Sequence, residues 1–182
     1  MTPKLKRLFI AVLIVQIVFL LGIVGYREAI LLNGRTAVLQ TVPIDPRDLF
    51  KGEYVTLRYE ISTIGGTVAS PSAKQYRIVG QIEEGDTVFV TLETIGEPNP
   101  YESRVVQADE PHEDADLFIK GRVISYKDRV ITVEYGIEQY FVPEGRGLEI
   151  ERADAVKVQV RIDRSGVAAI EELIVDGEVW ER

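Results

Sequence analysis

The hydrophobic and polar positions divide the chain into two parts with different periods. Between Leu8 and Tyr26 the sequence is almost continuously apolar, interrupted only by Gln16, Gly22 and Gly25. At ~1.5 Å rise per residue, a helix of about 19 residues just crosses a ~30 Å hydrocarbon layer. Farther along the chain, apolar residues recur at every second position, which is typical of β-strands. The pattern therefore predicts one membrane-spanning helix followed by a β-rich domain.

Two other interpretations of the apolar segment are a cleavable signal peptide and a buried helix of a soluble protein. A signal peptide has an apolar core of only ~7 to 15 residues and an A-x-A-like cleavage site. The apolar run in this chain is longer, and it has no such site. We therefore favour an uncleaved anchor. Lys4, Lys6 and Arg7 precede the span, so the positive-inside rule places the N-terminus in the cytoplasm and the rest of the chain outside.

This topology predicts four segments along the chain. They are a cytoplasmic basic tail (1–7), a transmembrane anchor (8–26), a juxtamembrane linker (27–35) and an extracytoplasmic β-rich domain (36–182). We expect the helix to continue from the anchor into the linker and to end at Asn33-Gly34, because Asn and Gly are common residues at helix C-termini.

The second part of the chain predicts about nine strands with closely spaced turns. The expected strands are TAVLQTVPI, EYVTLRYEIS, KQYRIVGQI, TVFVTLETI, DLFIKGRVISY, VITVEYGIEQYFV, AVKVQVRI, VAAIEELIV and EVW. Short turns (EEGD, KDR, DRSG and Asp176-Gly177) suit hairpins between successive strands. Residues 144–153 are a short helix candidate. The predicted fold is therefore mostly β, an antiparallel β-sandwich or barrel-like domain with one or two short helices.

The charge balance differs between the two parts of the chain. Residues 1–35 carry five basic side chains and one acidic side chain, a net charge of +4, so the remainder carries −12 to give the total of −8. Nucleic-acid binding depends on Lys and Arg that neutralise phosphates, so the acidic domain argues against it. The chain contains no cysteine, which excludes a disulfide framework, a Cys-based zinc site and a thiol nucleophile.

The most acidic stretch of the chain is VQADEPHEDAD, which also contains the only histidine, His112. Clustered carboxylates suit Ca²⁺, but the stretch lacks the D-x-[DN]-x-[DN]-G loop that would organise them. A run of charge is more commonly a solvated segment. We therefore predict neither a metal site nor a cofactor.

The densest group of candidate site residues lies in the stretch IDPRDLFKGEYVTLRY. Asp45 is a favourable N-cap, Asp48 lies in the first turn, and Gly52 is a natural helix terminator, so the stretch predicts a short helical turn that leads into a strand. Tyr59 falls on the apolar face of that strand, where its hydroxyl needs a hydrogen-bond partner such as Arg47 or Asp48. The candidate residues for binding are Asp45, Arg47, Asp48, Gly52, Glu53, Tyr54, Leu57 and Tyr59.

The segment GEYVTLRY (52–59) resembles the signature of the membrane-anchored GDYXXLXY family, with Glu53 in place of Asp. The stretches DPRDLFK and GIEQYFVPEGRGLEIE are similar to that family as well. The resemblance implies a bacterial protein held in the inner membrane by one N-terminal span, with a periplasmic or extracellular β-rich domain. It also implies a gene that often lies beside that of a polytopic membrane protein. It implies no catalytic residues.

Two classes of function are compatible with this sequence. One is an accessory or binding protein without catalysis of its own, which acts with a polytopic membrane partner or an envelope ligand. The alternative is an envelope glycan hydrolase that uses two of the carboxylates Asp45, Asp48 and Glu53. Arg47 and Lys51 argue against the hydrolase, because neighbouring cations lower a carboxyl pKa where a general acid needs a raised one. A type I signal peptidase is a further alternative, but the sequence lacks the Ser-Met-x-Pro-like box that carries the serine nucleophile of that class.

Overall fold

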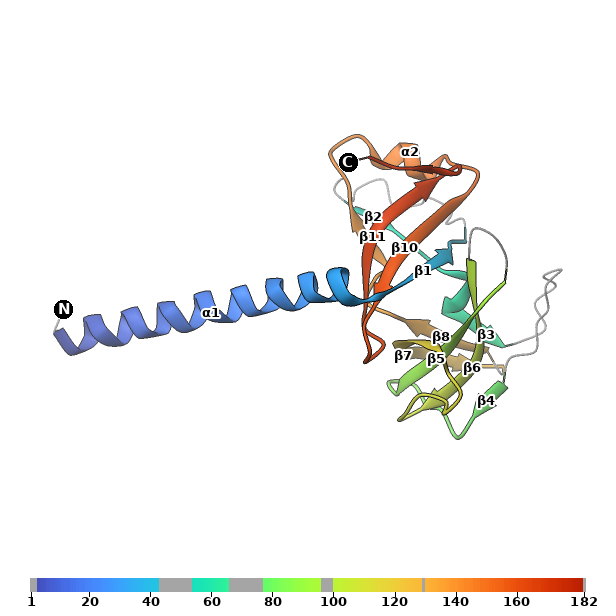
Figure 1. Cartoon of the computed structure of the whole chain (residues 1–182), viewed down its shortest axis with the longest axis horizontal. Coiled ribbons are helices and arrows are strands. Elements are labelled where there is room, and N and C mark those ends of the chain that lie inside the picture. The colour runs from blue at the N-terminus through green and yellow to red at the C-terminus, as the bar shows by residue number, and fades with distance from the viewer. Residues whose placement is uncertain (1–2, 43–53, 66–76, 96–99, 129, 182) are drawn as a thin grey trace.

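The computed structural model describes residues 3–42, 54–65, 77–95, 100–128 and 130–181. One long helix, α1 (Pro3–Asn33), projects from a β-rich domain that contains the remaining elements (Figure 1). Two short helices belong to the domain, the 3₁₀-helix η1 (Glu60–Ser62) and α2 (Gly147–Glu151). The mostly β fold with one N-terminal helix and few short helices is thus confirmed.

The described strands form one large mixed sheet and one small antiparallel sheet. The large sheet has ten strands in the order β12-β11-β10-β1-β6-β5-β7-β8-β3, with β4 paired to β6, and the small sheet contains β2 and β9. The bounds are β1 (Arg35–Gln40), β2 (Tyr54–Thr56), β3 (Thr63–Gly65), β4 (Arg77–Val79), β5 (Thr87–Thr94), β6 (Pro100–Ala108), β7 (Leu117–Lys127), β8 (Val130–Glu134), β9 (Gln139–Phe141), β10 (Val156–Ile162), β11 (Ala168–Val175) and β12 (Glu178–Val179).

The hairpins predicted late in the sequence are present. β7 pairs with β8, β10 with β11, and β11 with β12, each antiparallel. In β10, Val158, Val160 and Ile162 are all buried, as the alternation predicts. The side chains of alternate residues from both sheets meet in one hydrophobic core.

The prediction of a hairpin across EEGD, between β4 and β5, is wrong. β5 lies between β6 and β7 and is antiparallel to both, so neither of its edges is free for β4. β4 instead runs parallel to the end of β6, whose start pairs in parallel with β1. These two parallel pairs, and the strand β6 itself, were not predicted from the alternation.

The C-terminal end of α1 is fastened to the domain. The helix ends at Asn33 as predicted, and the amide of Gly34 donates to the carbonyl of Ile30 at 2.8 Å. Ile30 is buried, and Arg161 of β10 donates to the carbonyl of Gly34 at 3.2 Å. The hydroxyl of Tyr26 donates to Asp163 in the β10–β11 turn. By contrast, the rest of α1 is not packed against the domain. The helix is long and apolar enough to span a membrane, and no residue of its most apolar window is buried.

Replacing Gly34 with alanine should destabilise the junction between α1 and the domain. A Cβ atom there would lie 2.5 Å from the carbonyl oxygen of Ile30 and 3.0 Å from both Arg161 Cβ and the amide nitrogen of Ile162. Because these neighbours are mostly backbone, we expect a loss of about 1–3 kcal/mol in unfolding free energy, measured by denaturant titration in detergent micelles. Gly25→Ala is the matched control, since a Cβ there meets no atom within 4 Å. Equal losses in the two variants would contradict this account.

Candidate functional site

The candidate site is built around the strand that follows the acidic and basic cluster of the sequence. β2 pairs antiparallel with β9, with Val55 opposite Tyr140 and Thr56 opposite Gln139. One step beyond the strand, the amide of Leu57 donates to the carbonyl of Glu138 at 2.7 Å. The two stretches GEYVTLRY and GIEQYFV, which are far apart in the sequence, therefore lie side by side.

Two buried tyrosines join these stretches through reciprocal hydrogen bonds. The hydroxyl of Tyr59 donates to the carbonyl of Ile137 at 2.6 Å, and the hydroxyl of Tyr135 donates to the carbonyl of Ile61 at 2.6 Å. Burial raises the pKa of both phenols, and the carboxylate of Glu138 raises each pKa further. Both hydroxyls therefore stay protonated and remain donors far above neutral pH. We call this arrangement the tyrosine pair.

The structure describes three of the eight candidate site residues. Leu57 and Tyr59 are buried in the core, and the half-buried ring of Tyr54 packs edge-on against Phe141 with centroids 6.1 Å apart. The other candidates, and the predicted bond from Arg47 or Asp48 to Tyr59, lie outside the described residues; these candidates are Asp45, Arg47, Asp48, Gly52 and Glu53. The sequence was right that the hydroxyl of Tyr59 is buried and needs a partner, and the partner that the structure describes is Ile137.

Tyr135 is a site residue that the sequence analysis missed. It continues the alternation of Val133, Tyr135 and Ile137, all of which are buried. The same argument that singled out Tyr59, a phenol on an apolar strand face, applies to it. The signal was therefore present in the sequence, but it lay in a stretch without neighbouring charges.

A pocket of about 250 Å³ lies beside β2 and the residues that follow it. Three segments line it: residues 40–42 at the end of β1, residues 55–58 with Glu60, and Ile150 with residues 153–156 between α2 and β10. Hydrogen bonds connect these walls, because Thr41 donates to the carbonyl of Val156 through both its hydroxyl (2.7 Å) and its amide (3.1 Å). The amide of Val42 donates to the carbonyl of Arg58 at 2.8 Å. These hydrogen bonds to backbone carbonyls hold the pocket walls together.

A family model described as GDYXXLXY protein matches residues 16–173. The chain belongs to this family. Neither the curated proteins nor the solved structures gave a match. In the family motif GDYXXLXY, the named residues that the structure describes are Tyr54, Leu57 and Tyr59. They pack against the stretch GIEQYFV. Arg58 occupies one of the X positions of the motif and is exposed at the pocket. The described part of the motif thus serves mainly to dock a strand.

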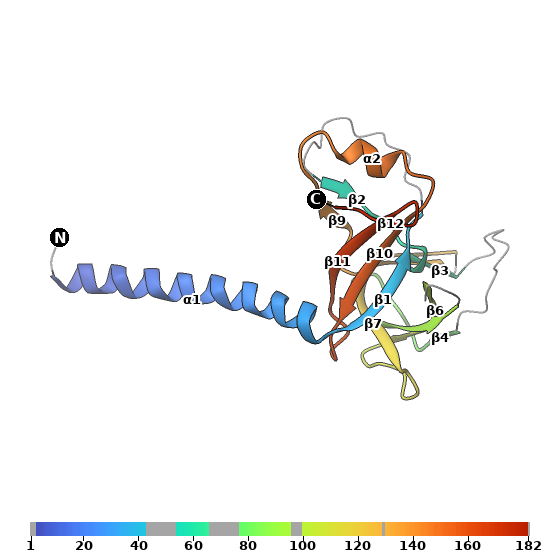
Figure 2. The ribbon, with the colours of Figure 1, turned by 45° about the horizontal axis from the view of Figure 1, so that its top comes forward.

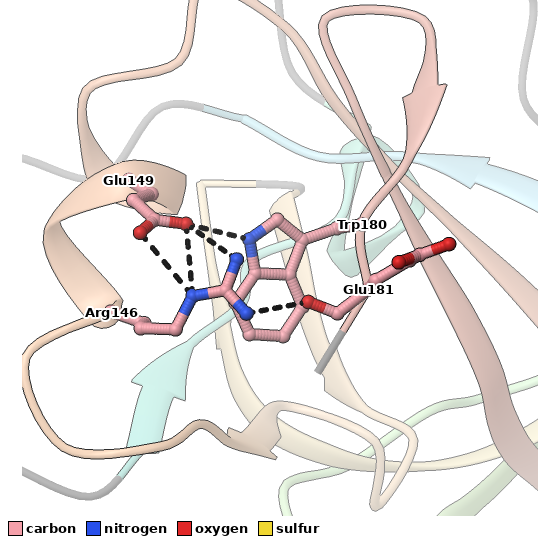
Figure 3. Close-up of polar contacts among 4 residues, drawn as sticks. All are labelled: Arg146, Glu149, Trp180 and Glu181. Atoms are coloured by element: carbon pink, nitrogen blue, oxygen red, sulfur yellow. Dashed lines mark hydrogen bonds and ion pairs between the residues drawn. The ribbon is translucent and has the colours of Figure 1, made fainter.

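A cluster of residues from α2 and the end of the chain holds α2 beside β2, which we call the motif strand (Figures 2 and 3). The guanidinium of Arg146 lies 4.5 Å from the centre of the Trp180 ring and donates to Glu149 (2.9 Å) and to the carbonyl of Glu181 (2.7 Å). The indole of Trp180 donates to the same carboxylate at 3.2 Å. The hydrogen bonds from Arg146 and then from Trp180 lower the pKa of Glu149. We call these four residues the C-terminal clasp.

The clasp connects the pocket to the core. The ring of Trp180 is almost fully buried and packs edge-on against Tyr140 of β9, with centroids 6.2 Å apart. Because α2 also supplies Ile150 to the pocket, the clasp fixes the position of one pocket wall. Within the described residues, no group of three or more His, Asp or Glu side chains is arranged to hold a metal ion. What the described residues do enclose is the pocket of about 250 Å³.

Removing the hydroxyl of Tyr59 should weaken the domain. In Tyr59→Phe the buried carbonyl of Ile137 loses its donor, which we expect to lower the unfolding free energy by about 1–3 kcal/mol in a urea titration. Tyr126→Phe is the control, because that side chain is exposed and the change should stay within about 0.5 kcal/mol. A Tyr59→Phe protein as stable as the wild type would show that the bond contributes nothing.

Removing the central cation of the clasp should expose the indole. Trp180 is the only tryptophan, so its fluorescence reports on this cluster alone. In Arg146→Ala the ring loses the guanidinium that covers it, and the emission maximum should move to longer wavelength with stronger quenching by iodide. Arg152→Ala, an exposed arginine just beyond α2, should leave the emission unchanged. An unchanged spectrum in Arg146→Ala would contradict the clasp.

Proposed function

We propose that this protein is a single-pass accessory or binding protein of the bacterial inner membrane, which performs no catalysis of its own and acts with a polytopic membrane partner. Its domain lies on the outer side of that membrane. The observation that carries the proposal is α1, whose most apolar window is unburied while its end is fastened to the domain by Ile30, Gly34 and Arg161. A helix joined in this way places the domain at a set height and angle above the bilayer.

The surface of α1 supports a helical partner within the bilayer. Ala11, Val15, Val18, Gly22 and Gly25 follow one another at alternating steps of four and three residues, which places them on one face of a helix. Small residues let the backbones of two membrane helices approach closely. A Cβ atom at Gly22 or Gly25 would meet nothing within 4 Å, so neither glycine is required by packing inside this chain. Contact with a neighbouring helix would account for them.

The height of the domain supports contact with the extramembrane part of the same partner. α1 continues beyond Tyr26 to Asn33, about two turns or ~10 Å above the end of the apolar run. Lys4, Lys6 and Arg7 at the other end favour a cytoplasmic N-terminus. The domain would therefore stand close to the outer membrane surface, within reach of the short loops of a polytopic protein.

Co-purification from gently solubilised membranes tests this proposal. The wild-type protein should retain a polytopic membrane protein in near-stoichiometric amount, identified by mass spectrometry. The double variant Gly22→Leu and Gly25→Leu should reduce that recovery at least about tenfold, because the bulkier face prevents close approach. Leu20→Ala changes the opposite face of α1 and should leave recovery intact.

Three results would contradict the proposal. They are repeated recovery of the wild-type protein alone, equal recovery from the glycine variant, and recovery only of a second copy of this chain. The last result would mean that the face of α1 with Gly22 and Gly25 serves self-association. Unfolding of the domain in each variant, followed through Trp180, separates loss of a partner from loss of fold.

A further inference from the structure

The pocket beside the motif strand contains charged side chains of both signs that do not pair with one another. Arg58 and Glu60 come from the segment after β2 and Asp154 from the segment between α2 and β10, and all three are exposed. Within the described part of the chain, none of the three takes part in an ion pair or a side-chain hydrogen bond. The pocket therefore offers one cationic and two anionic groups to an incoming molecule.

Several other arginines of the domain pair with carboxylates. Arg35 pairs with Asp116, Arg146 with Glu149 and Arg161 with Glu171, at 2.8–2.9 Å. Among the described residues Arg58 makes no such pair, and it differs from the other arginines without an ion pair in that it lines the pocket. The guanidinium of Arg58 is thus free to make the bidentate contact that a carboxylate favours.

Apolar residues also line the pocket. Val55, Leu57 and Ile150 are buried, and Val156 is half-buried between them and β10. A volume of about 250 Å³ is below the ~300–1,000 Å³ of pockets that take drug-sized molecules, so the matching ligand is small. The backbone of Arg58 is fixed by its hydrogen bond from Val42, so the pocket exists before any ligand arrives.

We propose that this pocket binds a small zwitterion with an apolar side chain, an apolar amino acid or a dipeptide. The ligand carboxylate contacts Arg58, its ammonium group contacts Asp154 and Glu60, and its side chain packs against the apolar lining residues. A purely anionic or purely cationic ligand would leave one sign of charge without a partner. Because position 58 is unspecified in the family motif, the ligand preference belongs to this chain and can differ in other members. The inference goes beyond the proposed function and does not require a membrane partner.

Isothermal titration calorimetry of the purified full-length chain in detergent tests the inference with L-leucine and L-leucyl-L-leucine as probes. At least one of them should bind saturably. Its C-terminal amide and its N-acetyl derivative should each bind at least about tenfold more weakly, because each removes one of the two charges. Arg58→Gln should weaken binding of the acid at least about tenfold and leave binding of the amide unchanged.

Arg164→Gln provides the matched control, because it makes the same change of charge at an exposed arginine in the β10–β11 turn. The inference is overturned by the absence of saturable binding of both probes up to ~10 mM, or by equal weakening in Arg58→Gln and Arg164→Gln. Since the titration uses the isolated chain, its failure leaves the co-purification result unaffected. Trp180 emission of each variant shows that the fold is intact.

Discussion

The tyrosine pair is the interaction on which the rest of the domain depends. Tyr59 and Tyr135 each bury a phenol in the core and each donate to a backbone carbonyl of the other's chain segment. A buried hydroxyl without a partner costs about 1–3 kcal/mol, so each ring is buried most favourably when the other segment is in place. The reciprocal bonds therefore couple the family motif to the stretch that precedes β9, across more than seventy residues of sequence.

This coupling sets the geometry of the elements around it. Once 54–59 lies along 137–141, the ring of Tyr140 meets Trp180, and Trp180 receives Arg146 from the start of α2. The motif strand, α2 and the end of β1 then enclose the pocket. In the large sheet, β10 pairs with β1, and Arg161 of β10 donates a hydrogen bond to Gly34 at the end of α1. The hydrogen bonds of the tyrosine pair thus help to set where the pocket lies relative to α1.

The sequence predicts those parts of the fold in which each strand has one apolar face. The alternation of β10 and the short turns after it predict the β10–β11–β12 meander. The alternation in EYVTLRYEIS likewise predicts the burial of Tyr59. β6 was not predicted because Glu102 and Arg104 interrupt any apolar alternation; in the fold, Arg104 forms an ion pair with Glu93 of the neighbouring strand β5 at 2.9 Å. The pocket was not predicted either, because no local pattern shows that the end of β1 approaches α2. Long-range pairing decides both features, and a single sequence carries no direct record of it.

The central claim is that the family motif is docked on the stretch 137–141, and a cross-link tests it most directly. The chain contains no cysteine, and Thr56 and Gln139 are exposed residues directly opposite each other in the β2–β9 pair. Cβ atoms of such pairs lie within ~5.5 Å, which suits a disulfide. Thr56→Cys with Gln139→Cys should form an intramolecular disulfide in the folded chain, seen as a reducible mobility shift, whereas Thr56→Cys with Glu134→Cys should not. Failure of the first pair to cross-link, or equal cross-linking of both pairs, would contradict the account.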